Sequence, residues 1–264
     1  MPSNIIAPGS EVPEFQETRL LDGRVVCYQP ATGYRSAIDP ILLQSAVPAK
    51  AGDTVLDLGC GIGAASLALA ARVEGLHVSG LDFQGLLVHW ASKGSTANGM
   101  ADHVRFYEGN VLDPQPPIKG IRFDHVMANP PYAKAGTSRP SPDPVKAAAT
   151  VEGKAKLADW VVAAAGLAGP GGSVTFIHRG DRAAELVDLM KVHFGELAIL
   201  SFFARTEDAD PSRIIVQGRA GGMPSCSRLA PIILHKTGGA YTSQADLLLR
   251  GQAALDLSNE NSDP

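Results

Sequence analysis

Short apolar runs alternate with longer amphipathic stretches along the chain from Thr54 onward. The short runs are typical of buried strands, whereas the longer stretches have the apolar spacing of helices. Because most predicted helices follow a strand, the pattern predicts a mostly parallel sheet with helices on both faces. The expected strands are Thr54–Leu58, His77–Leu81, Val104–Glu108, Phe123–Ala128, Ser173–His178, Leu197–Ala204 and Ile214–Gln217, and the expected helices are Ala64–Val73, Gln84–Asn98, Lys154–Leu167 and Arg182–His193.

The last two of these seven strands have no helix between them. A polar segment joins Leu197–Ala204 to Ile214–Gln217, which predicts an antiparallel hairpin at the edge of the sheet. Pro231–His235 is a candidate for one more strand. The expected fold class is therefore α/β, with a mostly parallel seven-stranded sheet and an antiparallel edge hairpin.

The segment before Thr54 predicts a small extension. Thr18–Leu21 and Arg24–Gln29 flank Asp22-Gly23, which is typical of a type I′ hairpin. Asp39 before Pro40 predicts a helix N-cap, with a helix from about Pro40 to Val47. The expected organisation is an N-terminal arm, hairpin and helix over 1–48, a single domain over 49–257, and a flexible tail over 258–264.

Composition and charge narrow the class of protein. The chain has 264 residues, 45% hydrophobic and 19% charged, which suits one α/β domain with a small extension. Its net charge is −4, so any basic face for a nucleic acid must be local. Three well-separated cysteines form no disulfide or metal-ligand pattern, and no apolar run reaches membrane-span length. We therefore expect a cytoplasmic protein, without metal or membrane, and we favour a monomer.

A glycine-rich turn follows the first predicted strand of the domain. Gly59, Gly61 and Ala64 fit the dinucleotide pattern GxGxxG/A, whereas Gly59, Gly61 and Gly63 fit the GxGxG of S-adenosylmethionine (SAM)-dependent methyltransferases. Glycines let the backbone approach a ligand where a Cβ would collide. The turn alone therefore predicts a nucleotide-like cofactor without deciding between the two.

Polar side chains near the strand ends add to this prediction. Asp57 precedes the first glycine by two residues, where a carboxylate could hold a ligand ammonium or an ordered water. Asp82 ends the next strand, where acceptor-only oxygens suit ribose hydroxyls. Asn110 follows the third strand and could face an adenine ring, although Gly-Asn is equally typical of a simple turn.

Asn129-Pro130-Pro131-Tyr132 ends the fourth predicted strand. In a doubly wound sheet this segment lies at the same edge as the glycine turn. The Asn129 side-chain carbonyl and the Pro130 backbone carbonyl could accept both N–H bonds of an amino group whose lone pair is delocalised, and so favour a pyramidal nitrogen. Tyr132 offers a flat ring for a planar group. The sequence therefore predicts transfer to an exocyclic or amide nitrogen.

These motifs together resemble those of the class I, Rossmann-like SAM-dependent methyltransferases that modify amino groups. The nearest likeness is to the small-domain methyltransferases, exemplified by the bacterial tRNA(Val) adenine-37 N6-methyltransferases. The resemblance covers roughly residues 18–250 and includes Arg35–Leu43 and Pro211–Val216. It implies SAM as cofactor and, as partner, RNA, with tRNA favoured.

The resemblance also implies roles for individual residues. Asp57, Gly59, Gly61 and Gly63 would line the methionine end of SAM, and Asp82 would bind its ribose. Asn110 would lie by the adenine, although many relatives carry Asp there. We extend the cofactor site to Phe83, Val111 and Asn129, and the reacting centre to Asn129, Pro130, Pro131 and Tyr132. Lys134, Arg139 and Lys146 are candidates for contacts with substrate phosphates.

Several alternatives stay open. Release-factor glutamine methyltransferases also use NPPY but carry a helical N-terminal domain, whereas about fifty residues precede the glycine turn here and predict a hairpin and one helix. DNA adenine, rRNA guanine and a SAM- or RNA-binding module without turnover are further alternatives. Guanine-directed relatives more often end the motif in Phe, so Tyr132 favours adenine or glutamine. A dehydrogenase ranks last, because it leaves Asn129–Tyr132 without a role.

Overall fold

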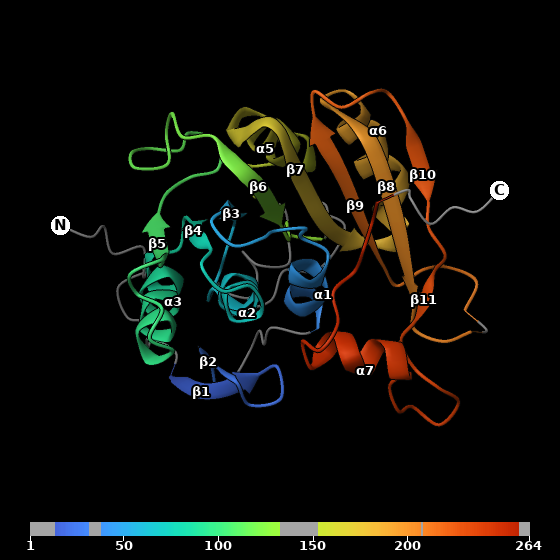
Figure 1. Cartoon of the computed structure of the whole chain (residues 1–264), viewed down its shortest axis with the longest axis horizontal. Coiled ribbons are helices and arrows are strands. Elements are labelled where there is room, and N and C mark those ends of the chain that lie inside the picture. The colour runs from blue at the N-terminus through green and yellow to red at the C-terminus, as the bar shows by residue number, and fades with distance from the viewer. Residues whose placement is uncertain (1–13, 32–37, 133–152, 207, 259–264) are drawn as a thin grey trace.

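The computed structural model describes residues 14–31, 38–132, 153–206 and 208–258. They form an α/β fold around a central nine-stranded sheet, with a separate two-stranded hairpin near the N-terminus (Figure 1). The candidate substrate residues Lys134, Arg139 and Lys146 lie outside the described residues. No helix in the described ranges is long and apolar enough to cross a membrane.

The order of strands along the main path of the sheet is β10-β8-β9-β7-β6-β3-β4-β5, and β11 also pairs with β8. The five strands β3 to β7 are parallel to their neighbours within this set, and β9 runs antiparallel to both β7 and β8. The strands are β3 (Thr54–Leu58), β4 (His77–Asp82), β5 (Val104–Glu108), β6 (Phe123–Ala128), β7 (Ala168–Arg179), β8 (Phe194–Phe203), β9 (Arg213–Ala220), β10 (Cys226–Arg228) and β11 (Ile232–Ile233).

All seven predicted strands are present, and the mostly parallel sheet is confirmed. The antiparallel hairpin β8–β9 is also present, but β9 lies inside the sheet between β7 and β8. Two short strands, β10 and β11, pair in parallel with β8 and bring the total to nine. β11 lies within the candidate strand Pro231–His235, whereas the three-residue β10 was not predicted.

Helices cover both faces of the sheet, as predicted (Figure 1). One core cluster joins the sheet to α1, α2, α3 and α7, and the other joins it to α5 and α6. The helices are α1 (Asp39–Ser45), α2 (Ala64–Arg72), α3 (Gly85–Ala97), α5 (Leu157–Leu167), α6 (Ala183–Lys191), which follows the 3-10 turn η1 (Gly180–Arg182), and α7 (Ser243–Leu249). The short helix α7 was not predicted.

The N-terminal hairpin consists of β1 (Phe15–Leu20) and β2 (Val25–Pro30). Pairing ends at Leu20 and Val25, so four residues form the connection, and the predicted two-residue type I′ turn is wrong. Leu21, the first residue after β1, has a φ of 50°, and its side chain is buried in the core. Asn98 at the end of α3 bonds both the N–H and the carbonyl of Val26, which holds the hairpin on that helix.

Candidate functional site

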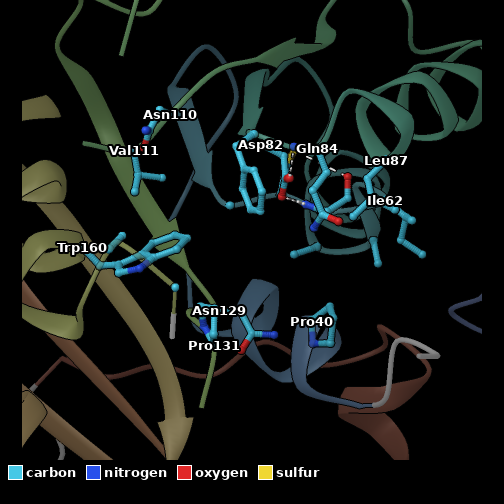
Figure 2. A pocket seen from close by; sticks show the side chains of 18 of the residues that line it. Pro40, Ile62, Asp82, Gln84, Leu87, Asn110, Val111, Asn129, Pro131 and Trp160 are labelled. Atoms are coloured by element: carbon cyan, nitrogen blue, oxygen red, sulfur yellow. Dashed lines mark hydrogen bonds between the residues drawn. The ribbon is translucent and has the colours of Figure 1, made fainter. Parts of the chain in front are cut away.

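A cavity of about 570 Å³ opens at the carboxyl ends of β3 to β6 (Figure 2). Its size is within the range of small-molecule sites. It also reaches residues of the N-terminal segment, from the end of β2 and the start of α1. Eight of the predicted site residues line it, namely Gly59, Gly61, Asp82, Phe83, Asn110, Val111, Asn129 and Pro131. Four described ones, Asp57, Gly63, Pro130 and Tyr132, do not line it.

The glycine turn needs its three glycines for different reasons. All three have left-handed backbones, with φ of 78° at Gly59, 54° at Gly61 and 76° at Gly63. A Cβ on Gly59 would collide with the ring of Trp160, and one on Gly63 would collide with Phe106. Nothing lies within 4 Å of the Cβ position of Gly61, which lines the cavity. Gly61 therefore leaves room for a ligand, whereas Gly59 and Gly63 allow close packing.

Asp82 joins the glycine turn to the end of β4. Its Oδ2 accepts a hydrogen bond from the Gly61 N–H, and its Oδ1 accepts one from the Gln84 N–H, each at 2.9 Å (Figure 2). Burial raises the pKa of Asp82 to about 6. Each carboxylate oxygen can accept more than one bond, so Asp82 can still receive ligand hydroxyls at neutral pH. This placement agrees with the ribose-binding role expected from the sequence.

Asp57 lies behind the turn rather than in the cavity. Its Oδ2 accepts a hydrogen bond from the Ser66 hydroxyl of α2 at 2.7 Å, and burial raises its pKa to about 7. The expected contact between Asp57 and a ligand ammonium stays a prediction, since Asp57 does not line the cavity. Since the carboxylate faces Ser66, its role here is to hold strand β3 to helix α2 directly after the turn.

Asn129 presents a buried acceptor at the end of β6. Its Oδ1 is inaccessible to solvent and has no hydrogen-bond partner among the described residues. Such an atom is costly to leave unpaired, and Asn129 itself lines the cavity. Figure 2 shows Asn129 and Pro131 on a different wall of the cavity from Asp82 and Gln84. Asp82 and Asn129 therefore face the cavity from different sides.

Asn110 forms the turn that the sequence offered as one interpretation, and it also lines the cavity. Its Oδ1 accepts a hydrogen bond from the Leu112 N–H at 3.0 Å, as in an Asx turn. The residue is exposed and also lines the cavity, next to the buried Val111. The turn bond does not use its amide nitrogen, so Asn110 can hold the turn and donate to a ligand.

An apolar wall completes the cavity. Phe83 is 51% exposed and lines the cavity, as do Ile62, Leu87 and Val111, and such apolar side chains suit a planar ring. Trp160 of α5 also lines the cavity, and its buried indole N–H has no partner among the described residues. Trp160 was not among the residues predicted for the site, and its ring lies over Gly59. No local signal distinguishes it from a core residue, since its helix is apolar throughout.

Other cavity residues that the sequence did not indicate are Gln29, Pro30 and Pro40, which come from the N-terminal segment. They show that the N-terminal hairpin and α1 are part of the site wall. Lys154 lines the cavity too and brings a positive charge to it.

The contacts of Tyr132 differ from those of an open surface on which a planar group could stack. Its hydroxyl donates to Asp39 Oδ2 at 2.7 Å, and Asp39 also accepts from Arg213 Nε at 3.0 Å. Asp39 was predicted to cap α1, and this is wrong. The cap position is Ile38, the helix begins at Asp39 itself, and no side chain caps it. The carboxylate instead links Tyr132 to the start of β9.

Comparisons with known proteins agree with this geometry. Residues 37–142 match the family model described as "Methyltransferase small domain". The domain contains the glycine turn, Asp82, Asn110 and Asn129–Tyr132, so the resemblance predicted from these motifs is confirmed.

Curated relatives with two different names match this chain. A "Release factor glutamine methyltransferase" of Chlorobaculum tepidum is 26% identical over 63% of this chain and 59% of its own length. A "tRNA1(Val) (adenine(37)-N6)-methyltransferase" of Porphyromonas gingivalis is 27% identical over 60% of this chain and 64% of its own. The matches thus span less than two thirds of these two relatives. A protein of Aeromonas salmonicida with the same tRNA1(Val) name is 26% identical over 78% of this chain and 84% of its own.

Solved structures show the same fold. A predicted O-methyltransferase of Agrobacterium tumefaciens is 27% identical, with a TM-score of 0.68 over 82% of this chain and 98% of its own. A Thermus thermophilus 16S rRNA N2 G1207 methyltransferase, solved with AdoMet and guanosine, has a TM-score of 0.54 at 20% identity over 81% of this chain and 52% of its own. The second likeness shows the fold alone. Together they confirm the Rossmann-like methyltransferase architecture around the domain.

Gly59→Ala tests the packing of the turn. An added Cβ would lie 2.6 Å from Cζ3 of Trp160, and a φ of 78° is strained for alanine. We expect a loss of about 2–5 kcal/mol in the free energy of unfolding, from strain of about 1–2 and overpacking of about 1–3. Urea unfolding measures it. Gly52→Ala is the control, because Gly52 has a φ of 90° with open space at its Cβ position. Equal losses in the two variants would show that the contact with Trp160 does not matter.

Proposed function

We propose that this chain is a SAM-dependent methyltransferase that forms N6-methyladenine in tRNA. The observation that carries the proposal is the buried, unpartnered Asn129 Oδ1 at the end of β6, in the same cavity as Asp82. A hydrogen-bond acceptor at this place suits an amino group that must be held by its N–H bonds. We further propose that the protein acts as a monomer in the cytoplasm, with residues 49–257 as the methyltransferase domain and 1–48 packed on it.

The residues present fit SAM as the cofactor. Asp82 has remaining acceptor capacity for ribose hydroxyls, and Gly61 leaves its Cβ position open. Phe83 and Val111 supply the apolar surface that an adenine ring needs, and the Asn110 amide is near for a polar contact. Lys154 brings a cation that can balance a ligand carboxylate. When bound, SAM supplies a methyl group that its sulfonium already activates.

The chain then has to orient the acceptor and stabilise the charge that develops on it. Asn129 Oδ1 accepts an N–H bond of the target amino group, and the positive character that grows on the nitrogen strengthens this bond. A preorganised carbonyl costs no reorganisation during the reaction. Pro130 and Pro131 restrict the backbone beside Asn129, because proline fixes φ. No strong base is needed before attack, since the N–H proton can pass to water after transfer.

RNA is supported over protein by two observations. The Aeromonas relative, which is matched over 84% of its length, is named as a tRNA methyltransferase, whereas the release factor methyltransferase is matched over 59%. Arg179 ends β7, where it pairs with Asp181, and Arg205 lies two residues after β8, which runs parallel to β7; both are at the same edge as Asn129. These arginines are placed where phosphates around the target base could lie. Arg219 is at the other end of β9 and does not belong to this edge.

The second candidate is methylation of a glutamine amide in a release factor. The Asn129 acceptor suits a planar amide as well as an adenine amino group, and a release factor glutamine methyltransferase is among the relatives. Amino groups of rRNA or DNA, or SAM and RNA binding without turnover, are further alternatives. The site geometry treats these acceptors alike, so a substrate comparison has to separate them.

The experiment is methyl transfer from labelled SAM by the purified protein. The acceptors are unmodified tRNA, rRNA, DNA and a release factor isolated from cells that lack the corresponding gene. We expect label in tRNA, recovered as N6-methyladenosine after digestion. Label in the release factor instead would favour the glutamine alternative. Binding of SAM with no label in any acceptor would support the non-catalytic alternative.

A further inference from the structure

A charged pair holds Tyr132 between two elements that are distant in sequence. The Tyr132 hydroxyl donates to Asp39 Oδ2 on α1 at 2.7 Å. Arg213, the first residue of β9, donates from Nε to both oxygens of Asp39 at 3.0 Å. Asp39 is only 6% exposed, and these two donors provide hydrogen bonds to both of its carboxylate oxygens. The phenol is therefore part of a buried ionic contact.

The ring of Tyr132 is also covered. The guanidinium carbon of Arg213 lies over the ring, 5.0 Å from its centroid. The imidazole of His178 lies with its centroid 5.0 Å from that of Tyr132, inclined by 55°. His178 is fully buried, and burial together with the nearby Arg182 lowers its pKa to about 4, so the imidazole is neutral at physiological pH. One face of the phenol ring is thus under a guanidinium, and the ring does not line the cavity.

The backbone of Tyr132 has a further restraint. Arg182 donates from its Nη1 to the Tyr132 carbonyl at 3.4 Å, and its own position is held by Glu185 at 2.7 Å. Both the side chain and the main chain of Tyr132 are therefore fixed. Because Tyr132 is three residues after Asn129 and the residues between are prolines, fixing Tyr132 restricts the orientation of Asn129.

We propose that Tyr132 is a positioning residue, which Asp39 and Arg213 anchor so that the turn presents Asn129 Oδ1 to the target amino group. This inference rests on the proposed function. It replaces the sequence-based hypothesis that the ring of Tyr132 is a platform on which the target group stacks. An anchor needs its hydroxyl and the Asp39–Arg213 pair, whereas a platform needs only a flat ring. The two roles therefore respond differently to substitution.

Tyr132→Phe and Tyr132→Leu distinguish them. In Tyr132→Phe the ring stays and the bond to Asp39 is lost, so we expect kcat to fall about tenfold to a hundredfold, as for loss of a hydrogen bond to a charged group. We expect KM for SAM to stay unchanged and Tyr132→Leu to lose about as much. Arg213→Lys keeps the charge but loses the planar group over the ring, and we expect an intermediate kcat. Wild-type kcat in Tyr132→Phe with a loss only in Tyr132→Leu would overturn the anchor and support the platform.

A second measurement is independent of the substrate. The NMR signals of the Asn129 side-chain amide, recorded on the full chain without substrate, report the order of this group. We expect them to shift or broaden in Tyr132→Phe and in Arg213→Lys. Tyr241→Phe is the control, because Tyr241 stacks on His235, away from the cavity. Unchanged Asn129 signals in both Tyr132→Phe and Arg213→Lys would contradict the anchor, even if no methyl acceptor is found. Absence of methyl transfer by the wild-type protein to any acceptor would overturn only the proposed function.

Discussion

Asn129→Ala is expected to lower kcat for methyl transfer by about a hundredfold to a thousandfold, the loss seen when one preorganised polar group is removed from a charge-stabilising site. Binding of SAM should stay within about twofold of wild type, because the strand end and the glycine turn remain in place. The physical reason is that Asn129 Oδ1 is buried without a partner among the described residues and so is available to the target N–H. Single-turnover kinetics with labelled SAM, together with calorimetric titration of SAM, measure both quantities.

Thr242→Ala is the control for this variant. The Thr242 hydroxyl caps α7 by accepting from the Ala245 N–H, and Thr242 does not line the cavity, so its loss should lower stability while kcat is retained. The assigned mechanism fails if Asn129→Ala turns over at the wild-type rate. A parallel loss of SAM binding would show instead that Asn129 serves the cofactor rather than the target.

Asp82→Ala is expected to weaken SAM binding by about a hundredfold or more. The variant loses the acceptor for ribose hydroxyls, and it also leaves the N–H groups of Gly61 and Gln84 without their partner. Each lost hydrogen bond to a charged group is worth about 1.5–3 kcal/mol, so the loss of two or more accounts for this magnitude. Asp82→Asn keeps one acceptor oxygen and should bind with intermediate affinity. Calorimetric titration of SAM measures all three proteins.

The raised pKa of Asp82 predicts that the affinity for SAM depends on pH. Because burial raises the pKa of Asp82 to about 6, the carboxylate that accepts ligand hydroxyls is present above this pH and is protonated below it. We expect SAM affinity to fall as the pH drops through about 6 in the wild type. Asp82→Asn should not show this fall. Asp82 would have no contact with the cofactor if Asp82→Ala bound SAM as tightly as the wild type does. The same conclusion would follow if the wild type and Asp82→Asn had the same pH profile of SAM affinity.

Strand-end positions made the central site predictable. Asp82 and Asn129 follow strands whose carboxyl ends must meet at one edge of a parallel sheet, and both line the cavity. Asp57 also lies in a predicted strand, but the sequence does not show that its side chain is directed at Ser66 on the covering helix. Asp39 satisfies the local pattern of a cap, yet Arg213, 174 residues away, determines where its carboxylate lies. Contacts of this separation leave no local signal.

Elements that depend on tertiary pairing also could not be predicted from the sequence. The strands β10 and β11 contain three and two residues, so no period of alternation can develop in them. Trp160 reaches the cavity only because α5 packs its ring against Gly59. Gln29 and Pro30 reach it because Asn98 docks the hairpin on α3. By contrast, the long alternation of strands and helices predicted the architecture, because it repeats along most of the chain.

The most direct test of the proposed function is mass spectrometry of modified nucleosides in tRNA and rRNA from wild-type cells and from cells that lack this gene. The proposal predicts that N6-methyladenosine disappears from a tRNA fraction in the deletion strain and returns when the wild-type gene, but not Asn129→Ala, is supplied. Unchanged N6-methyladenosine in every RNA fraction of the deletion strain would contradict it.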